Sequence, residues 1–213
     1  MFVPLLSAED GYGVTYGGQF AVAGSVASTS RVVFPLTWGA DKRAAAEYQK
    51  EVGGRLAPKL RAGGLMERRT NPYFRSDADR ASVYARGEWR VRGPVFAATT
   101  VARQRSTLLG RTDRTTSIGA DVTLDTRIDP LLPTNAIYAR ATFAHLIFPG
   151  QAINRIEVDA RGYIGVYRGS VLCLRLVRED VSRPAPPFFK SLLGGSDTLR
   201  GFRAGSFIGD TLM

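Results

Sequence analysis

The chain has 213 residues, of which 44% are hydrophobic and 10% aromatic, and its formal net charge is +10. This length and apolar content indicate one sizeable folded domain and exclude a disordered chain. The 23 glycines and 11 prolines favour many strands joined by turns over long helices. No run approaches the roughly eighteen consecutive apolar residues of a membrane-spanning helix, although strands that cross a membrane also keep a low mean hydropathy.

The excess of basic residues raises the question of a nucleic-acid partner. Most of these residues stand singly among acids, as in the segments 86–92 and 155–161. No recognised nucleic-acid-binding module accompanies them, so we expect no such partner.

Two further features bear on the compartment. Residues 1–7 lack the pattern of a signal peptide, so either the leader of an exported protein lay upstream or the interpretation as an exported protein is wrong. Cys173 is the only cysteine of the sequence, which excludes an internal disulfide and leaves the redox compartment undecided. Its position predicts a lumen-facing side chain without chemistry.

The clearest pattern is a period of two over residues 117–127, which residues 155–167 repeat. It predicts strands with one face toward lipid and the other toward a wet lumen. A soluble sandwich alternates as well, but several runs last about ten residues or more, closer to a tilted membrane-crossing strand than to a soluble strand of about five or six. The apolar positions are Ile118, Ala120, Val122, Leu124 and Thr126 in the first run and Ile156, Val158, Ala160, Ile164 and Val166 in the second.

Eleven strands are predicted along the chain. The connections after Arg92 and around Arg168 are short, and that between Leu108 and Arg114 is longer, as expected for short periplasmic turns opposite longer outer loops. Prolines at 184, 186 and 187 end the pattern, a long glycine-punctuated loop runs to Asp210, and residues 211–213 open another strand. The predicted strands cover residues 2–6, 13–23, 31–39, 43–52, 56–70, 82–92, 95–105, 116–127, 136–148, 154–167 and 170–179.

The polar face of these strands carries acids and bases together. Its predicted lumen-facing charged residues are Asp121, Asp125, Arg127, Glu157, Asp159 and Arg161. The four carboxylates could form a catalytic cluster, but ion pairing inside a polar barrel is the simpler explanation because they stand among arginines. His145, the only histidine of the sequence, has no nucleophile or acid at motif spacing. We therefore expect no enzyme activity, no metal and no cofactor.

Four large aromatic residues fit the girdles that lie at membrane interfaces. They are Trp38, Tyr48, Trp89 and Tyr138. Aromatic side chains pack many cores as well, so a core position is the alternative for each.

The long loop contains the most specific motif of the sequence. It runs Leu193-Gly194-Gly195-Ser196-Asp197-Thr198-Leu199-Arg200-Gly201-Phe202-Arg203-Ala204-Gly205. This segment closely resembles the sixth extracellular loop of the BamA/TamA family of outer-membrane insertases, the bacterial surface antigens, whose signature is Gly-Gly followed five residues later by Arg-Gly-Phe. Asn71-Pro72-Tyr73-Phe74 resembles a run in the family's early strands, and residues 124–134 resemble its eighth strand and the turn after it.

The resemblance implies an all-β fold: an antiparallel up-and-down transmembrane β-barrel in the bacterial outer membrane. In the family this loop follows the eleventh of sixteen strands, and eleven strands are predicted before it here. Residues 1–213 are expected to form a truncated barrel domain with strands 1 to 11 and the start of strand 12, and residues 181–210 the long extracellular loop. Strands 13 to 16 and the periplasmic POTRA domains of the family have no counterpart in the sequence, so we interpret the chain as a fragment.

The resemblance also implies a function: insertion of other proteins into the outer membrane through lateral opening of the barrel and strand pairing. In the family the loop folds into the lumen, where its arginine, matched by Arg200, meets acidic side chains of later strands. Gly201 would give tight backbone passage and Phe202 a hydrophobic anchor. Turn geometry alone is the alternative for the glycines of the motif, which are Gly194, Gly195, Gly201 and Gly205. The expected partners are outer-membrane lipid or lipopolysaccharide, client outer-membrane proteins and periplasmic accessory subunits.

Three other functions stay open. A two-partner secretion translocator shares the barrel and a similar loop but conducts an unfolded client through its pore. A patatin-type phospholipase uses such a barrel as its membrane anchor, although its nucleophile-elbow motif is not in this sequence. A soluble basic β-protein would show the same alternation with its apolar face in a core.

Overall fold

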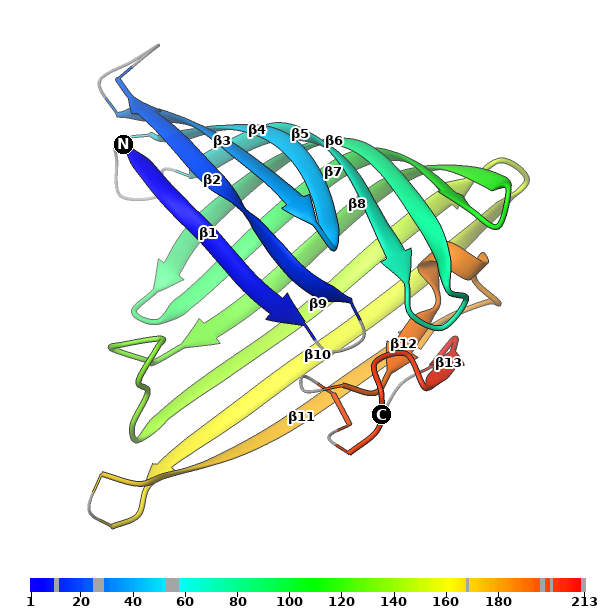
Figure 1. Cartoon of the computed structure of the whole chain (residues 1–213). Helices are drawn as coiled ribbons and strands as arrows, with labels where there is room; N and C mark the ends of the chain where they lie inside the picture. The colour runs from blue at the N-terminus through cyan, green and yellow to red at the C-terminus, as the bar shows by residue number, and fades with distance from the viewer. Residues whose placement is uncertain are drawn as a thin grey trace.

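The computed structural model describes residues 1–9, 12–24, 29–52, 58–167, 169–195, 198–199 and 201–211, and its main element is an antiparallel sheet of eleven strands. Each strand pairs with the next one along the chain, so the sheet is an up-and-down meander (Figure 1). A short 3-10 helix, η1 (Pro187–Phe189), and a hairpin of β12 (Ser191–Leu193) and β13 (Phe207–Gly209) follow the sheet. The strands of the sheet are β1 (Phe2–Glu9), β2 (Gly13–Ala23), β3 (Ser30–Gly39), β4 (Asp41–Glu51), β5 (Lys59–Asn71), β6 (Ser76–Arg92), β7 (Val95–Leu108), β8 (Arg111–Asp125), β9 (Ala136–Phe148), β10 (Gln151–Gly165) and β11 (Val171–Val181).

All eleven predicted strands are present, which confirms the predicted all-β, up-and-down architecture. The bounds of β2 and β9 are those predicted, whereas β6 begins at Ser76 instead of residue 82. Residues 76–81 pair with β5, although Asp77, Asp79 and Arg80 conceal the apolar alternation there. The prediction began this strand too late because both of its faces are polar near this end, so the period of two is hidden there.

The connections differ from the predicted pattern. The longer connection expected between Leu108 and Arg114 is a two-residue turn, Leu109-Gly110, whose positive φ angles of 55° and 74° suit the twist of a tight hairpin. The prediction was wrong because threonines and arginines beside the turn hide the continuing strands. The turns at 72–75, 109–110 and 149–150 share the end of the sheet at which β11 ends, which we call the loop end. Residues 126–135 form a longer connection at the opposite, far end.

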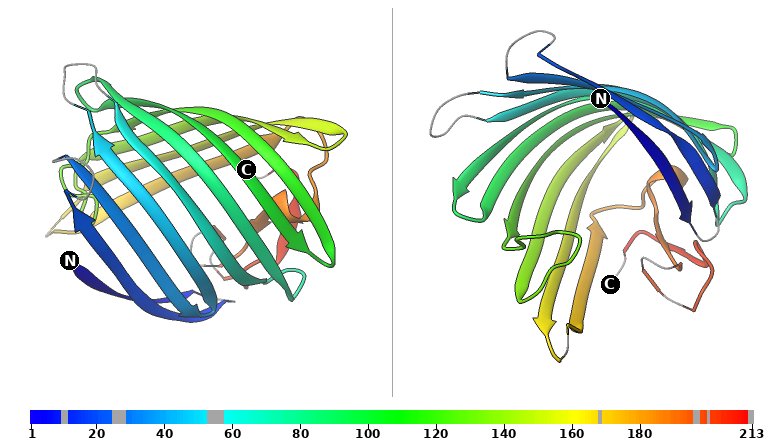
Figure 2. Two further views of the ribbon diagram at one scale, coloured as in Figure 1. Left: turned by 90° about the horizontal axis from the view of Figure 1, so that it is seen from above. Right: turned by 60° about the vertical axis from the view of Figure 1, so that its left-hand side comes forward.

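The sheet is curved, and its two faces differ. Residues 182–195 and 201–211 lie on the concave face, which we call the inner face, and the convex face is the outer face (Figure 2). In β8 the outer side chains of Ile118 and Val122 are 53% and 55% exposed, whereas the inner Thr115 and Asp121 are 4% and 5% exposed. The alternation predicted for this strand is confirmed.

The sheet does not close over the ranges that the structure describes. There β1 pairs only with β2 and β11 only with β10, so the curved sheet has two edges (Figure 2). β13 pairs with β12 and does not extend the main sheet. Of the strand predicted for residues 211–213, Thr211 is not in a strand, and residues 212–213 lie outside the described part of the chain.

Three of the four predicted girdle aromatics lie on the outer face. Trp38 stands near the loop end and Trp89 near the far end, and Tyr48 lies between Val32 and Ala62 in the register. The prediction is wrong for Tyr138, which lies on the inner face beside the guanidinium of Arg127. The even-numbered positions of β9 face inward, and alternation had not been used to place this residue.

The remaining candidates for chemistry stand apart. His145 lies on the outer face, with Nδ1 2.6 Å from Oδ1 of Asn154. Cys173 is exposed and shares the inner face with Tyr163. Within the ranges described, no three His, Cys, Asp or Glu side chains gather as a metal site. No helix in the described part of the chain is long and apolar enough to span a membrane.

Pro35 weakens the pairing between β3 and β4. It lies inside β3 and has no N–H to donate to a neighbouring strand. The register between the two strands accordingly passes from Val33 opposite Glu47 to Leu36 opposite Ala44, without partners for Phe34 and Pro35. The ladder therefore has a local gap.

A carboxylate on the outer face of β8 should impair membrane integration more than one on the inner face. Val122→Asp places the charge toward lipid, at an expected cost on the order of 1–2 kcal/mol, whereas Thr123→Asp faces inward opposite Arg140. We expect urea-unfolding in vesicles to show a lower stability for Val122→Asp than for Thr123→Asp. Equal stabilities would contradict the assignment of the two faces.

Candidate functional site

The inner face is polar, and its central group is Asp121 of β8 with two arginines. Nη1 and Nη2 of Arg86 in β6 lie 2.6 Å and 3.0 Å from the carboxylate oxygens of Asp121, and Nε of Arg140 in β9 lies 2.9 Å from Oδ1. Arg86 also donates to Oγ1 of Thr100 at 3.1 Å. A carboxylate shielded from water is tolerated only when it is paired. This group therefore links four neighbouring strands through their side chains.

A second group surrounds the ring of Tyr138 near the far end. The guanidinium carbons of Arg127 and Arg161 lie 4.4 Å and 5.4 Å from the ring centroid, within the roughly 6 Å reach of a cation–π contact. Asp125 accepts a hydrogen bond from Nε of Arg127 at 2.9 Å, and Asp159 accepts one from Nη2 of Arg161 at 2.6 Å. The hydrogen bond to Asp125 raises the pKa of Arg127 above its usual range, so this arginine stays charged.

A third group joins β10 to β11. Asp159 also accepts a hydrogen bond from Nη2 of Arg175 at 3.0 Å. Arg155 lies 2.6 Å from Glu157 and also pairs with Glu179. The four carboxylates proposed from the sequence are spread over β8 and β10, with β9 between them, and each contacts an arginine. The six charged positions named in the sequence thus lie in ion pairs on the inner face: Asp121, Asp125, Arg127, Glu157, Asp159 and Arg161.

The chain after β11 is held on the inner face by an apolar contact. Leu146, Phe148 and Ile153, at the loop end of β9 and β10, are buried beneath Ala185 and Phe189. The rings of Phe148 and Phe189 meet edge to face with centroids 5.1 Å apart. Full burial of such side chains contributes about 1.5–3 kcal/mol each, so this contact anchors the loop.

Asp210 joins the two ends of the loop. Its Oδ1 accepts a hydrogen bond from the backbone N–H of Ala185 at 2.9 Å, and its Oδ2 lies 3.4 Å from Nζ of Lys190. β12 and β13 pair just inside this junction. The loop therefore leaves and re-enters the same place on the inner face.

The glycines of the motif lie between β12 and β13, where they have backbone conformations that other residues rarely adopt. Gly194 and Gly195 have φ angles of 117° and 93°. A Cβ on Gly194 would lie 2.1 Å from the carbonyl oxygen of Arg203, so only glycine fits there. Gly201 also has a positive φ, 91°, but a Cβ there would meet nothing within 4 Å. Backbone approach is therefore tight at Gly194, not at the predicted Gly201.

The structure describes the contacts of Phe202 but not those of Arg200, the two other motif residues for which a role was predicted. Phe202 is 49% exposed, its ring lies 5.3 Å from that of Phe207, and its carbonyl accepts a hydrogen bond from the N–H of Gly195. These contacts are internal to the loop. Arg200 lies outside the residues that the structure describes, and its contact with acidic side chains stays a prediction.

The loop also contacts the turn between β5 and β6. A Cβ added to Gly205 would lie 2.8 Å from Cγ of Pro72 and 3.0 Å from the nitrogen of Tyr73. Oδ1 of Asn71 holds this turn by accepting hydrogen bonds from the N–H groups of Tyr73 and Phe74, both at 3.1 Å. The segments 71–74 and 193–205, which carry the resemblance separately in the sequence, thus meet in space (Figure 1).

Sequence reasoning missed the residues that dock the loop. Leu146, Phe148 and Ile153 occupy inner-face positions of β9 and β10, and most other inner positions of these strands carry polar or small side chains. This break in the alternation is a signal that could have predicted an inner-face contact. Asp210 gave no comparable signal, because a single carboxylate in a loop has no pattern.

Gly194→Ala should loosen the loop more than Gly201→Ala. Both changes put a side chain at a positive φ, but only the first meets a backbone oxygen. We expect limited proteolysis of the full-length protein to cut near residues 194–206 several times faster in Gly194→Ala than in Gly201→Ala. Equal cleavage rates would contradict the close approach to Arg203.

Comparison with known families agrees with this arrangement. Residues 15–211 match the model of the Omp85 superfamily domain, a range that contains most of β2, all of β3 to β11 and the loop motif. No curated protein matches the chain. The chain therefore belongs to the Omp85 superfamily, whose members are outer-membrane β-barrel proteins that take part in protein insertion or secretion.

Proposed function

We propose that this protein inserts other β-barrel proteins into the outer membrane by pairing their strands with the edge of β1, in the manner of BamA/TamA-type insertases. The observation that carries the proposal is that edge. Over the described ranges β1 pairs only with β2, and no described strand occupies its other side. Such an edge templates pairing with another chain.

Pro4 limits how strongly a strand can bind at this edge. Met1 and Ala21 exchange two backbone hydrogen bonds of 2.9 Å, and the direction of hydrogen bonding alternates along a strand. Phe2, Pro4 and Leu6 therefore direct their backbone groups to the free edge. Because Pro4 has no N–H, a partner strand lacks one hydrogen bond there. This supports pairing that forms and is released again.

Contacts on the outer face keep β1 itself in the sheet. The ring of Phe2 covers Gly18, where an added Cβ would lie 2.3 Å from the ring, and it lies 5.0 Å from the ring of Phe20. An aromatic side chain over a glycine replaces the contact that the glycine lacks. β1 can then hold to β2 while its other edge accepts a client.

A two-partner secretion translocator is the second candidate, and the polar inner face favours it. Ion pairs such as Arg86 with Asp121 neutralise charge along a surface that water can wet. In that mechanism the client would pass the inner face and leave the edge of β1 unoccupied. The two functions therefore differ in where the client touches the protein.

Disulfide cross-linking separates the two candidates. In a Cys173→Ser background, cysteine is placed at one of three positions. These are Leu6 on the edge strand β1, Val101 on the outer face of β7 in the middle of the sheet, and Thr123 on the inner face of β8. A client with single cysteines along one strand is then folded in the presence of each variant. We expect cross-links at residue 6, at every second client position, and none at residue 101. Cross-links at residue 123 without cross-links at residue 6 would favour the translocator and sink the insertase proposal.

Restoring a donor at position 4 should lengthen the stay of a client strand. Pro4→Ala adds one N–H to the edge, and one net hydrogen bond of about 0.5–1.5 kcal/mol corresponds to roughly 2- to 10-fold slower release. Pro35→Ala is the matched control, because it adds an N–H between β3 and β4, away from the edge. Release is timed by the decay of the residue-6 cross-link after a chase with excess client. The same release rate in Pro4→Ala and the unmodified protein would contradict strand pairing at this edge.

A further inference from the structure

An apolar groove crosses the outer face between β3 and β8. Its floor consists of the small residues Ala44, Ala46, Gly64 and Ala81, and larger side chains such as Phe34 rise beside it. The hollow measures about 870 Å³, within the about 300–1,000 Å³ of pockets that hold small molecules. Because it opens on the face that is directed toward lipid, an occupant would come from the membrane.

Three arginines border the groove on β7 and β8. Arg103, Arg105 and Arg114 all lie on the outer face and are exposed, and no ion pair joins them to any residue that the structure describes. Arg105 stands directly opposite Arg114 in the register. Like charges directly opposite in a sheet are destabilising, and a charge toward lipid adds a further cost. An anion between the two side chains would remove both penalties.

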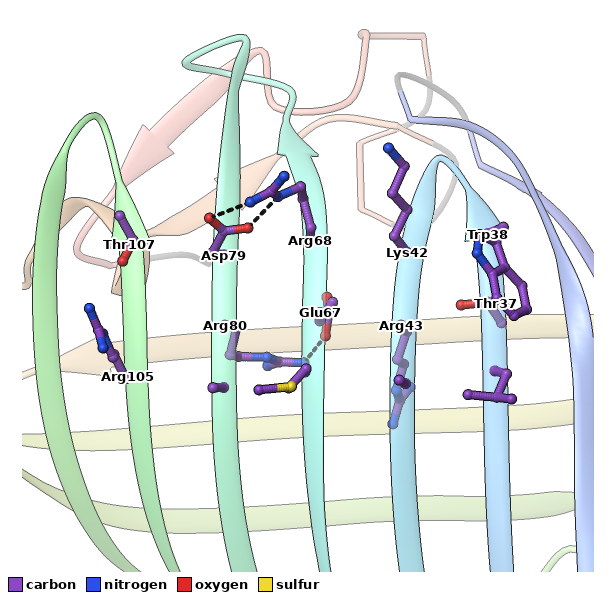
Figure 3. Close-up of a pocket in the computed structure, with 14 residues that line it drawn as sticks. Thr37, Trp38, Lys42, Arg43, Glu67, Arg68, Asp79, Arg80, Arg105 and Thr107 are labelled. Carbon is purple, nitrogen blue, oxygen red and sulfur yellow. Dashed lines mark hydrogen bonds and ion pairs between the residues drawn. The ribbon is translucent and has the colours of Figure 1, made fainter.

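A second hollow of about 580 Å³ adjoins the groove toward the loop end and shares Arg105 with it (Figure 3). Lys42, Arg68 and Asp79 lie along it, with Trp38 at its side (Figure 3). Asp79 neutralises Arg68 through hydrogen bonds of 2.5 Å and 3.1 Å. Arg80 pairs with Glu67, so Lys42, Arg43 and Arg105 keep this hollow basic.

On β7 and β8 the outer basic residues lie toward the loop end. Toward the far end the outer positions of β7 and β8 are uncharged, as at Val95, Ala97, Val122 and Leu124. Long arginine side chains can reach the interface while their stems stay on apolar surface. The positive charge is thus directed at the headgroups of the membrane leaflet on the loop side, next to an apolar groove.

We propose that this groove binds a phosphorylated lipid of that leaflet. Arg103, Arg105 and Arg114 hold the phosphate, since guanidinium groups bind phosphate oxygens through paired, charge-assisted hydrogen bonds. The acyl chains lie along Ala44, Ala46 and Gly64. The inference rests on the outer-membrane location and not on the activity toward clients, so either can fail without the other.

The test uses the full-length protein in nanodiscs of phosphatidylcholine with or without a fraction of phosphatidic acid, a phosphomonoester lipid. The heat-unfolding midpoint and the lipids retained on extraction, measured by native mass spectrometry, are the readouts. We expect phosphatidic acid to raise the midpoint and to be retained in preference to phosphatidylcholine. Equal retention of the two lipids would overturn the proposal.

A paired substitution gives the sharper result. In phosphatidylcholine alone, Arg105→Gln with Arg114→Gln should unfold at a higher temperature than the unmodified protein, because the repulsion is gone. With phosphatidic acid the paired variant should show no rise in the midpoint, and it should retain at least about tenfold less of that lipid than the unmodified protein does. Arg178→Gln is the control, since Arg178 lies at the same end of the outer face but pairs with Asp180 and lies outside the groove. If the paired variant keeps its lipid, the arginines do not form the site.

Two further arms address the source of the phosphate and the role of the groove. Ala46→Phe fills the groove while the arginines stay, and we expect it to lower retention of phosphatidic acid. Inorganic phosphate should leave the midpoint unchanged at the concentration at which the lipid acts. A rise equal to that with the lipid, or full retention in Ala46→Phe, would mean that the arginines bind a free anion and would overturn a lipid site.

Discussion

The hydrogen-bond ladder between neighbouring strands is the constraint on which the other features of this molecule depend. In hydrocarbon no water satisfies a free backbone group, so each strand must find both of its partners within protein. The meander from β1 to β11 does this with the next strand on either side, and short turns at the loop end keep the register. Alternation of side chains follows from the same geometry, with apolar groups outward and charged groups inward. Only β1 and β11 leave a side of the ladder unpaired over the described ranges, and the proposed function depends on the first of these edges.

The inner face carries both many charged side chains and a long loop. Asp121, Asp159 and their arginines neutralise one another across β6 to β11, so the curved sheet is cross-braced by side chains. At the loop end this polar surface gives way to Leu146, Phe148 and Ile153, where the chain after β11 is anchored. From there the loop reaches the turn between β5 and β6 at Gly205. The loop therefore spans the concave side and connects strands that are far apart in the sheet.

Much of the fold could be predicted from the sequence, and the predictions that were wrong share one physical cause. Eleven strands were predicted because the period of two survives wherever lipid demands an apolar side chain. It disappears near the loop end, where Asp77, Arg105 and Arg114 stand on the outer face, and there β6, β7 and β8 were predicted too short and a tight turn was taken for a loop. The inward direction of Asp121 follows from alternation, but its two arginine partners depend on register across four strands. The meeting of Gly205 with Pro72 is a tertiary contact that no local pattern encodes.

The contact between Asp210 and Ala185 determines how well the loop can tolerate insertions during evolution. Because this carboxylate binds the backbone of residue 185, the segment 185–210 is a loop whose two ends are joined, and we call this junction the base of the loop. The entropy of closing a flexible segment grows slowly, by about 0.6 kcal/mol for each doubling of its length. Residues inserted between β12 and β13 would leave this base and the edge-to-face pair of Phe148 and Phe189 undisturbed. The loop can therefore vary in length between its two ends while the base keeps one geometry.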